Sequence, residues 1–134
     1  MSTSMRNPGF IRPAIAEATI ADGVACVVGT ADYSAAVAAN NPVAGLIGIA
    51  KVDGGGSVAS GSTVDIVTSG IYPGVAMASI TQGQAVTVGD SAGGLKPAAP
   101  SAGVNLMVLG IAQADAASGD RVAVQIGIYL MQGA

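Results

Sequence analysis

The last stretch of the chain constrains the fold most strongly. From Val122 to Leu130, large aliphatic side chains occupy every second position, and smaller or polar residues lie between them. Alternation of period two over nine residues predicts a β-strand with one buried face. The preceding Ser118-Gly119-Asp120 is typical of a tight turn. We therefore expect a turn followed by a long strand, with Val124 on its buried face.

A similar pattern occurs earlier in the chain. The matched segments are 48–53 with 110–115, 59–61 with 117–119, 64–66 with 122–124, and 70–72 with 127–129. The first copy has four more residues in its loop, where Gly54-Gly55-Gly56-Ser57 is the natural insertion, and one more before Gly70. Each copy has the order strand, Gly/Ser turn, strand, so we interpret the chain as one β-hairpin unit used twice.

Further short apolar runs are separated by Gly or Pro turns. Runs 14–20 and 24–28 flank Asp22-Gly23, a combination that predicts a hairpin. Between 79 and 88 the core candidates are Ile80, Val86 and Val88; a tight turn follows at 89–94, and two prolines predict a loop at 97–103. Together these segments predict an all-β fold, a small barrel or sandwich, with a single domain over residues 14–134.

The alanine-rich segment 30–41 differs from the rest. It has cap candidates at Thr30 and Asp32 and a stop at Asn40-Asn41-Pro42, which favours one to two helical turns. A loop inserted between strands is the alternative. We therefore expect at most one short helix, as an excursion from a β-chain.

Residues 1–13 contain Pro8, Gly9 and Pro13 and show no periodicity, which predicts an extended N-terminal arm rather than a packed element. Phe10 is the only phenylalanine. An exposed aromatic on such an arm would be an anchor for a partner surface. Alternatively, Phe10 folds back to cap the core of its own domain.

The composition restricts the possible partners. Of the residues, 51% are hydrophobic, but only 3% are aromatic and 10% charged, against about 25% charged in typical domains. So few charges suggest that other chains cover much of the surface, although a poorly charged monomer is the alternative. A net charge of −3 without a basic stripe argues against nucleic-acid binding. Apolar runs such as 42–50 are too short for a membrane helix, and we expect no signal peptide.

Catalytic chemistry has few candidates in this sequence. There is no histidine, which removes Ser-His-Asp and Cys-His arrangements and the commonest zinc ligand. Cys26 lies in an apolar run and is expected to be a small buried residue. Gly89-Asp90-Ser91-Ala92-Gly93-Gly94 resembles a serine-protease loop, but a glycine-rich hairpin tip explains it. We expect no metal, no cofactor and no enzymatic activity, while a Ser-Lys or paired-carboxylate enzyme stays open.

Several motifs, taken in order and with their spacing, carry a resemblance that runs from about residue 14 to residue 131. They are Gly48-Ile49-Ala50, Ala59-Ser60-Gly61, Gly70-Ile71-Tyr72, Gln82-Gly83-Gln84-Ala85-Val86, Gly93-Gly94-Leu95-Lys96-Pro97-Ala98, Leu109-Gly110-Ile111-Ala112 and Ala117-Ser118-Gly119-Asp120-Arg121-Val122-Ala123-Val124. The chain resembles the capsid cement, or head decoration, proteins of tailed bacteriophages.

This resemblance implies a compact β-tulip-like fold and a structural role on the virion. Such proteins usually sit as homotrimers at three-fold and quasi-three-fold positions on the outside of the expanded capsid, where they clamp the major capsid protein against DNA pressure. The N-terminal arm commonly reaches the capsid. The contact residues implied here are Arg6, Asn7, Pro8, Phe10, Ile11 and Arg12. The alternative is a trimeric fibre, spike or host-adhesion module.

Overall fold

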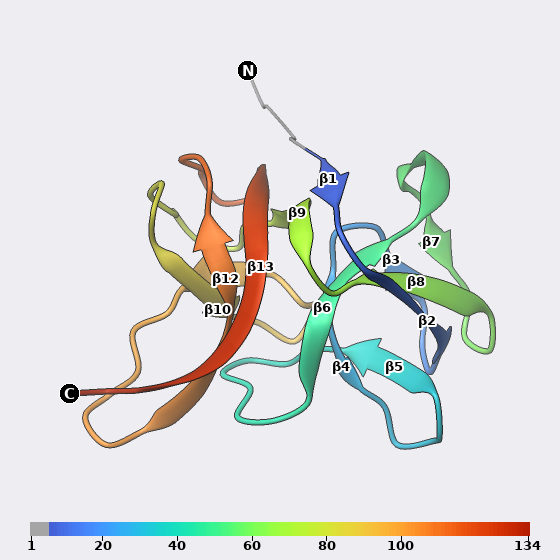
Figure 1. The fold of residues 1–134 in the computed structure, drawn as a ribbon, viewed down its shortest axis with the longest axis horizontal. Coiled ribbons are helices and arrows are strands. Elements are labelled where there is room, and N and C mark those ends of the chain that lie inside the picture. Colours follow the sequence, from blue (N-terminus) through green and yellow to red (C-terminus); the bar gives the residue numbers. More distant parts are fainter. Residues whose placement is uncertain (1–5) are drawn as a thin grey trace.

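The computed structural model describes residues 6–134, which are almost entirely β-structure arranged in two lobes (Figure 1). One lobe is a six-stranded sheet and the other is a closed five-stranded barrel. Among the described residues, the only helical element is the single 3-10 turn η1 (Asp53–Gly55). The expected all-β class with at most one short helix is therefore confirmed.

The six-stranded sheet is antiparallel throughout. Its strands, in spatial order, are β1 (Asn7–Pro8), β9 (Gly70–Val75), β13 (Arg121–Gln132), β12 (Asn105–Ala112), β10 (Ala85–Val88) and β11 (Leu95–Pro97). The β10–β11 hairpin closes through the glycine-rich turn at 89–94, as expected. Asp90 stabilises this turn because its Oδ1 accepts hydrogen bonds from the backbone N–H groups of Ala92 and Gly94.

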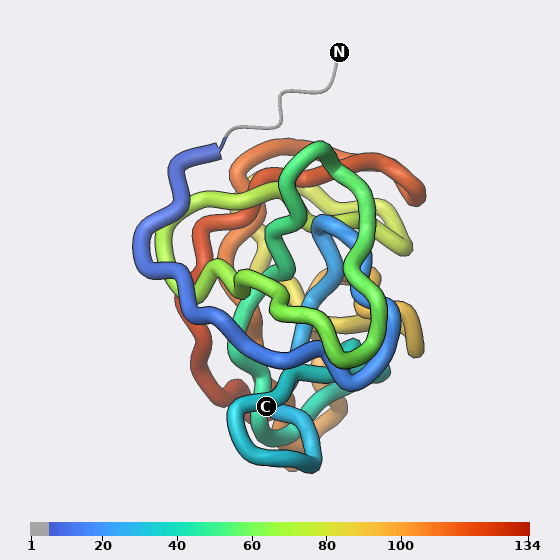
Figure 2. Tube along the Cα trace, turned by 90° about the vertical axis from the view of Figure 1, so that its right-hand side faces the viewer, coloured from blue at the N-terminus to red at the C-terminus, as the bar shows by residue number. Residues whose placement is uncertain are grey.

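The barrel contains strands from the first half of the chain. They are β2 (Ile11–Ala16), β5 (Ser34–Val37), β4 (Ala25–Val28), β6 (Leu46–Lys51) and β8 (Thr63–Val67). One pair, β2 with β5, is parallel, and the others are antiparallel. Figure 2 looks onto this lobe, with the blue β2 segment running along its outside. A small ribbon of β3 (Ile20–Ala21) and β7 (Ser57–Val58) completes the fold.

The two sequence copies form two hairpins with the same register. In the first, β6 pairs with β8 and Ala50 lies opposite Ile66; in the second, β12 pairs with β13 and the matching Ala112 lies opposite Val124. The repeated hairpin unit is therefore confirmed. Each lobe contains one copy.

The two copies share a glycine, and the same steric conflict excludes a larger residue at this position in both. A Cβ built on Gly48 would lie 2.0 Å from the carbonyl oxygen of Val67, and one built on Gly110 would lie 2.0 Å from that of Gln125. Both carbonyls belong to equivalent positions on the partner strand. Real Cβ atoms do not approach an oxygen so closely, so each hairpin requires glycine here.

The copies differ after their second strand. In the first copy the chain leaves β8 at Val67 and begins β9 at Gly70, whereas β13 continues unbroken to Gln132. Two residues of β13, Gly127 and Ile128, oppose the single residue Leu109 of β12, which is a β-bulge. The bulge shifts the alternation of side chains by one position. As a result Leu130, expected on the buried face, is 54% exposed.

Two apolar clusters stabilise the molecule. The first fills the barrel with small and β-branched side chains: Ala14, Ala16, Ile20, Cys26, Ala35, Ala50, Val64 and Ile66. The second lies between the sheet and the barrel and includes Ile49, Tyr72, Leu95 and Val124. The predicted burial of Val124, Cys26, Ile80, Val86 and Val88 is confirmed.

The hairpin predicted at Asp22-Gly23 is wrong. The turn exists, with Gly23 at φ +87°, but the strands on either side of it do not pair with each other. In the barrel, β5 lies between β2 and β4. The local turn signal was outweighed by barrel closure, which places a later strand between the two.

The helical turns predicted for 30–41 are also wrong, because this segment supplies β5. Residues Ser34–Val37 are extended, and Tyr33 just before them has a φ of +60°, which the interior of a right-handed helix does not allow. Ala35 is fully buried among the side chains of the barrel core. Tertiary packing therefore overrides the helix propensity of alanine. The segment therefore contributes a strand to the barrel and is not an insertion between strands.

Residues 7–13, assigned to the N-terminal arm, are extended but hydrogen-bonded into both lobes. Asn7 and Pro8 form β1 at the sheet edge, and Ile11 to Pro13 belong to β2 of the barrel. The part of the predicted arm at residues 1–5 lies outside the described residues.

Candidate functional site

The junction between the lobes is organised around one buried carboxylate. Asp22, whose side chain is 1% exposed, lies in the turn between β3 and β4. Its Oδ1 accepts hydrogen bonds from the Tyr72 hydroxyl at 2.7 Å and from the Val52 backbone N–H at 2.8 Å. Its Oδ2 accepts one from Arg121 at 3.0 Å. Donors from β9, β13 and the end of β6 thus converge on one carboxylate.

Arginine side chains surround this carboxylate. The guanidinium of Arg121 also donates to the carbonyl of Pro73 at 2.8 Å. That of Arg6 lies 3.9 Å from Asp22 and 5.3 Å from the centroid of the Tyr72 ring, a cation–π distance. Glycine is favoured next to Asp22, because Gly23 has a φ of +87°, a left-handed conformation that residues with a Cβ rarely adopt.

The pKa values fit a structural role for this cluster. Burial raises the pKa of Asp22, but the hydrogen bonds from Tyr72, Val52 and Arg121 outweigh it and hold the pKa below its ordinary value. Burial and the bond to Asp22 raise the pKa of Tyr72 to about 12. Asp22 therefore stays ionised and Tyr72 protonated. A carboxylate closed off by its donors joins the lobes rather than acting as an acid or base.

Two other kinds of chemical site, a reactive cysteine and a metal centre, have no support among residues 6–134. Cys26 is fully buried, and burial raises the pKa of its thiol to about 12. No group of three or more Cys, Asp or Glu residues that could hold a metal ion occurs in the described part of the chain. No helix within it is long and apolar enough to cross a membrane.

One exposed apolar surface lies along β2. We call it the N-terminal face and define it as Phe10, Ile11, Ile15 and Tyr33. Phe10 is 79% exposed, yet its backbone N–H donates to Ser69 Oγ and its carbonyl accepts from the Thr68 N–H. The aromatic ring is therefore displayed from a fixed backbone, and the alternative that Phe10 caps its own core is wrong.

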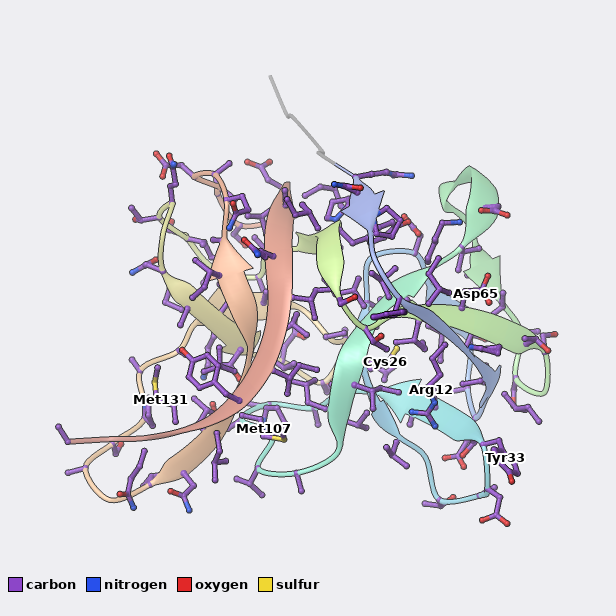
Figure 3. The ribbon with its side chains drawn as sticks, viewed as in Figure 1. Arg12, Cys26, Tyr33, Asp65, Met107 and Met131 are labelled. Carbon is purple, nitrogen blue, oxygen red and sulfur yellow. The ribbon has the colours of Figure 1, made fainter. Side chains whose placement is uncertain are left out.

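Tyr33 extends this face at the outer end of the barrel (Figure 3). It is 80% exposed, and its carbonyl accepts a hydrogen bond from the Ile15 N–H. Its loop is held by Glu17, whose Oε2 accepts from the Ala31 N–H and from the hydroxyls of Thr30 and Ser34. These bonds lower the pKa of Glu17 to about 2.

A second exposed apolar surface lies at the far end of the β12–β13 hairpin. We call it the C-terminal face and define it as Val43, Val104, Tyr129 and Leu130, with the half-buried Met107 and Met131. Tyr129 and Met131 lie on one side of the sheet and Leu130 and Met107 on the other, so this surface includes both sides of the hairpin end. Figure 3 shows both methionines at this end, opposite Tyr33. Val43, Val104, Leu106 and Lys96 line a shallow cleft of about 180 Å³ there. Sequence reasoning missed this face because the β-bulge is not visible in the alternation pattern.

The six predicted contact residues do not form one surface. The side chains of Phe10 and Ile11 belong to the N-terminal face. Asn7 and Pro8 lie at the sheet edge, and Arg12 is half-buried. Arg6 is half-exposed but is oriented toward Tyr72 and Asp22. Phe10 and Ile11 are therefore exposed on the surface, whereas Arg6, Asn7 and Pro8 hold the N-terminal segment against the rest of the protein.

Comparison with known proteins relates the fold to a phage head structure. No protein-family model and no curated protein matches the chain. Among solved structures, it is similar to one described as head fiber gp8.5 N base in bacteriophage phi29. The TM-score is 0.63 with 20% identity, over 88% of this chain and 93% of that one. At this identity the similarity shows a shared fold.

Proposed function

We propose that this protein is a non-enzymatic structural component of a bacteriophage head, a capsid cement or decoration protein. It would bind the outside of the expanded capsid as a homotrimer and stabilise the lattice of the major capsid protein. The observation that carries the proposal is the fold shared with a head fiber base over nearly the whole chain. The motif resemblance described above supports the same assignment.

The surface chemistry agrees with this role. The molecule has two exposed apolar faces on a hydrogen-bonded β-framework, and among its described residues no group of three or more Cys, Asp or Glu side chains could hold a metal ion. A protein that binds the assembled lattice but not free subunits stabilises the lattice by mass action. Several weak contacts repeated by symmetry slow its release.

We propose the N-terminal face as the capsid contact. Phe10 is a displayed aromatic on a hydrogen-bonded backbone, so little conformational entropy is lost when it binds. Ile11 and Ile15 continue the surface along β2. The arginines have different roles in this proposal: Arg6 holds the segment on Tyr72, while Arg12 lies at the edge of the surface.

The test uses point variants, because deletion of residues 1–13 would remove β1 and half of β2. Purified Phe10→Ser protein is mixed with expanded heads that lack it, and the bound copies are counted by quantitative mass spectrometry. We expect near-stoichiometric binding of the wild type and at least a tenfold loss of affinity for Phe10→Ser. The control Val28→Ser removes a half-exposed apolar side chain of the barrel that lies outside the N-terminal face.

The copy number separates the alternatives. A few wild-type copies per head would indicate a fibre or vertex component, and no binding would contradict the head assignment. Equal binding of wild type and Phe10→Ser would leave the assignment but refute this face as the contact.

A further inference from the structure

The edges of the six-stranded sheet are protected unequally. The edge strand β1 has only two residues, one of them Pro8, and the opposite edge strand β11 carries Lys96 and Pro97. Such residues block the addition of a further strand. The second half of β13 forms a third edge, because β9 pairs with β13 only as far as Ile126.

This third edge has no such protection. Between Gly127 and Gln132, β13 pairs with β12 on one side, and within the described chain no residue hydrogen-bonds to its other side. The segment contains no proline and no charged side chain, and Tyr129 and Leu130 are exposed on it. An exposed apolar strand edge of this kind is a template for pairing with another chain.

The charge distribution indicates which chain. No charged side chain occurs in 33–50, in 97–114 or after Arg121, the segments that supply the C-terminal face. Asp115, Asp120 and Arg121 lie at the other end of the β12–β13 hairpin, and Lys96 is the one charged residue in the adjoining cleft. Two copies of an uncharged surface can associate without repulsion between like charges. A charged partner, in contrast, would find no opposite charges on this surface.

The residue types agree with self-association. Interfaces are enriched in tyrosine and methionine, and those between identical subunits are the more apolar ones. The C-terminal face contains Tyr129 and Met131 on one side of the sheet and Leu130 and Met107 on the other. The unpaired backbone N–H and C=O groups along the free edge of β13 could also form hydrogen bonds that fix the orientation of the second copy.

We infer that copies of this chain associate through the C-terminal face, with the free edge of β13 at 127–132 paired to a second copy. Pairing of this edge with the same edge of a second copy is a two-fold contact, so it is separate from the three-fold contact of the proposed homotrimer, and it does not depend on capsid binding. It also separates two surfaces: the C-terminal face joins copies, and the N-terminal face remains free for the head.

The experiment places a lysine on the edge. Sedimentation equilibrium over a range of concentrations is measured for wild type, Leu130→Lys and the control Tyr33→Lys, whose side chain is also exposed but lies on the N-terminal face. We expect an oligomer for wild type and Tyr33→Lys, and at least tenfold weaker association for Leu130→Lys. Tyr129→Lys is a second variant in case the first does not fold, and circular dichroism verifies the β-structure.

Hydrogen exchange tests the strand edge itself. In wild type the amides of 127–132 that point away from β12 should be protected, and in Leu130→Lys they should exchange rapidly. A monomeric wild type, or a Leu130→Lys protein that assembles normally, would overturn the inference. Loss of head binding by Leu130→Lys together with a monomeric wild type would also overturn it, since the capsid would then be the occupant. Loss of head binding by Phe10→Ser with assembly intact leaves it standing.

Discussion

The hydroxyl of Tyr72 donates a 2.7 Å hydrogen bond to the buried carboxylate of Asp22, and this contact joins β9 of the sheet to the β3–β4 turn of the barrel lobe. The two residues are fifty positions apart in sequence. Because Arg121 and Val52 donate to the same carboxylate, the two lobes and both hairpin units depend on it. The stability of the whole molecule should therefore respond to changes at this point.

We expect Asp22→Ala to lower the free energy of unfolding by about 2–4 kcal/mol, because it leaves Arg121 and Tyr72 without their acceptor in a partly closed site. Tyr72→Phe should cost about 1.5–3 kcal/mol, since it removes one bond to a charged group. Urea denaturation measures both. The matched control is Asp53→Ala, which removes an exposed ion pair with Lys51 and should change little. Equal effects at Asp22 and Asp53 would contradict the role of the junction.

The pH dependence of stability follows from the same site. The pKa of Asp22 lies below its ordinary value of 3.8 in the folded protein, so ionised Asp22 favours folding. Its contribution is complete above the unfolded pKa and is lost as the pH falls through the folded pKa. Unfolding free energies measured from neutral pH to pH 2 should therefore fall less steeply in Asp22→Asn than in wild type. Parallel curves would show that Asp22 does not contribute.

Val124→Asp should abolish folding, because Val124 is fully buried in the cluster between the lobes and a charge there has no partner. The neighbouring Gln125 is exposed on the other face of β13, so Gln125→Asp should stay folded. Circular dichroism and solubility distinguish the two variants. A soluble Val124→Asp protein with a cooperative transition would show that the faces of β13 are assigned incorrectly.

Gly48→Ala and Gly110→Ala should each destabilise the protein by about 1–3 kcal/mol or more, since the added methyl group meets a carbonyl of the partner strand and forces the hairpin apart. Gly127→Ala is the control, because nothing lies within 4 Å of a Cβ at that position. Thermal unfolding midpoints report the difference. If the protein is equally stable with alanine at either position, the explanation that steric conflict requires glycine in both copies is wrong.

The Tyr33 loop should change its structure only in strong acid. The bonds that Glu17 accepts from Ala31, Ser34 and Thr30 lower its pKa from 4.5 to about 2. The depressed pKa means that the contribution of Glu17 is present above pH 4.5 and is lost as the pH falls through about 2. NMR titration of the Glu17 carboxyl carbon and the Tyr33 ring measures this change. In Glu17→Gln the loop signals should already be altered at neutral pH; unchanged signals would refute the contact.

The sequence alone was sufficient for the fold class and for the repeated hairpin. Apolar alternation and turn glycines are local signals, and the hairpins at 48–66 and 110–124 depend on neighbouring segments of chain. The buried positions of Ile80, Val86 and Val124 followed from the same alternation.

Other features could not be predicted because they depend on contacts between distant segments. The parallel pairing of β2 with β5 follows from barrel closure and overrides both the Asp22-Gly23 turn signal and the alanine propensity at 35–38. Asp22 looked like an ordinary turn residue because its donors, Tyr72 and Arg121, are remote in sequence. The β-bulge at Gly127-Ile128 lies within an uninterrupted alternation, so the exposure of Leu130 was hidden. The N-terminal face was anticipated only at Phe10 and Ile11.

The unequal loops of the two hairpins indicate where the molecule accepts foreign sequence. The first copy has four residues more than the second around Gly54–Gly56, and yet both hairpins keep one register. A Cβ on any of these three glycines meets no atom within 4 Å. Lengthening a surface loop that already connects two paired strands costs little additional loop-closure entropy. A peptide epitope or small binding domain inserted there would be displayed from the loop between β6 and β7, which contributes no residue to either apolar face, and if the protein coats a phage head it would be displayed once per copy.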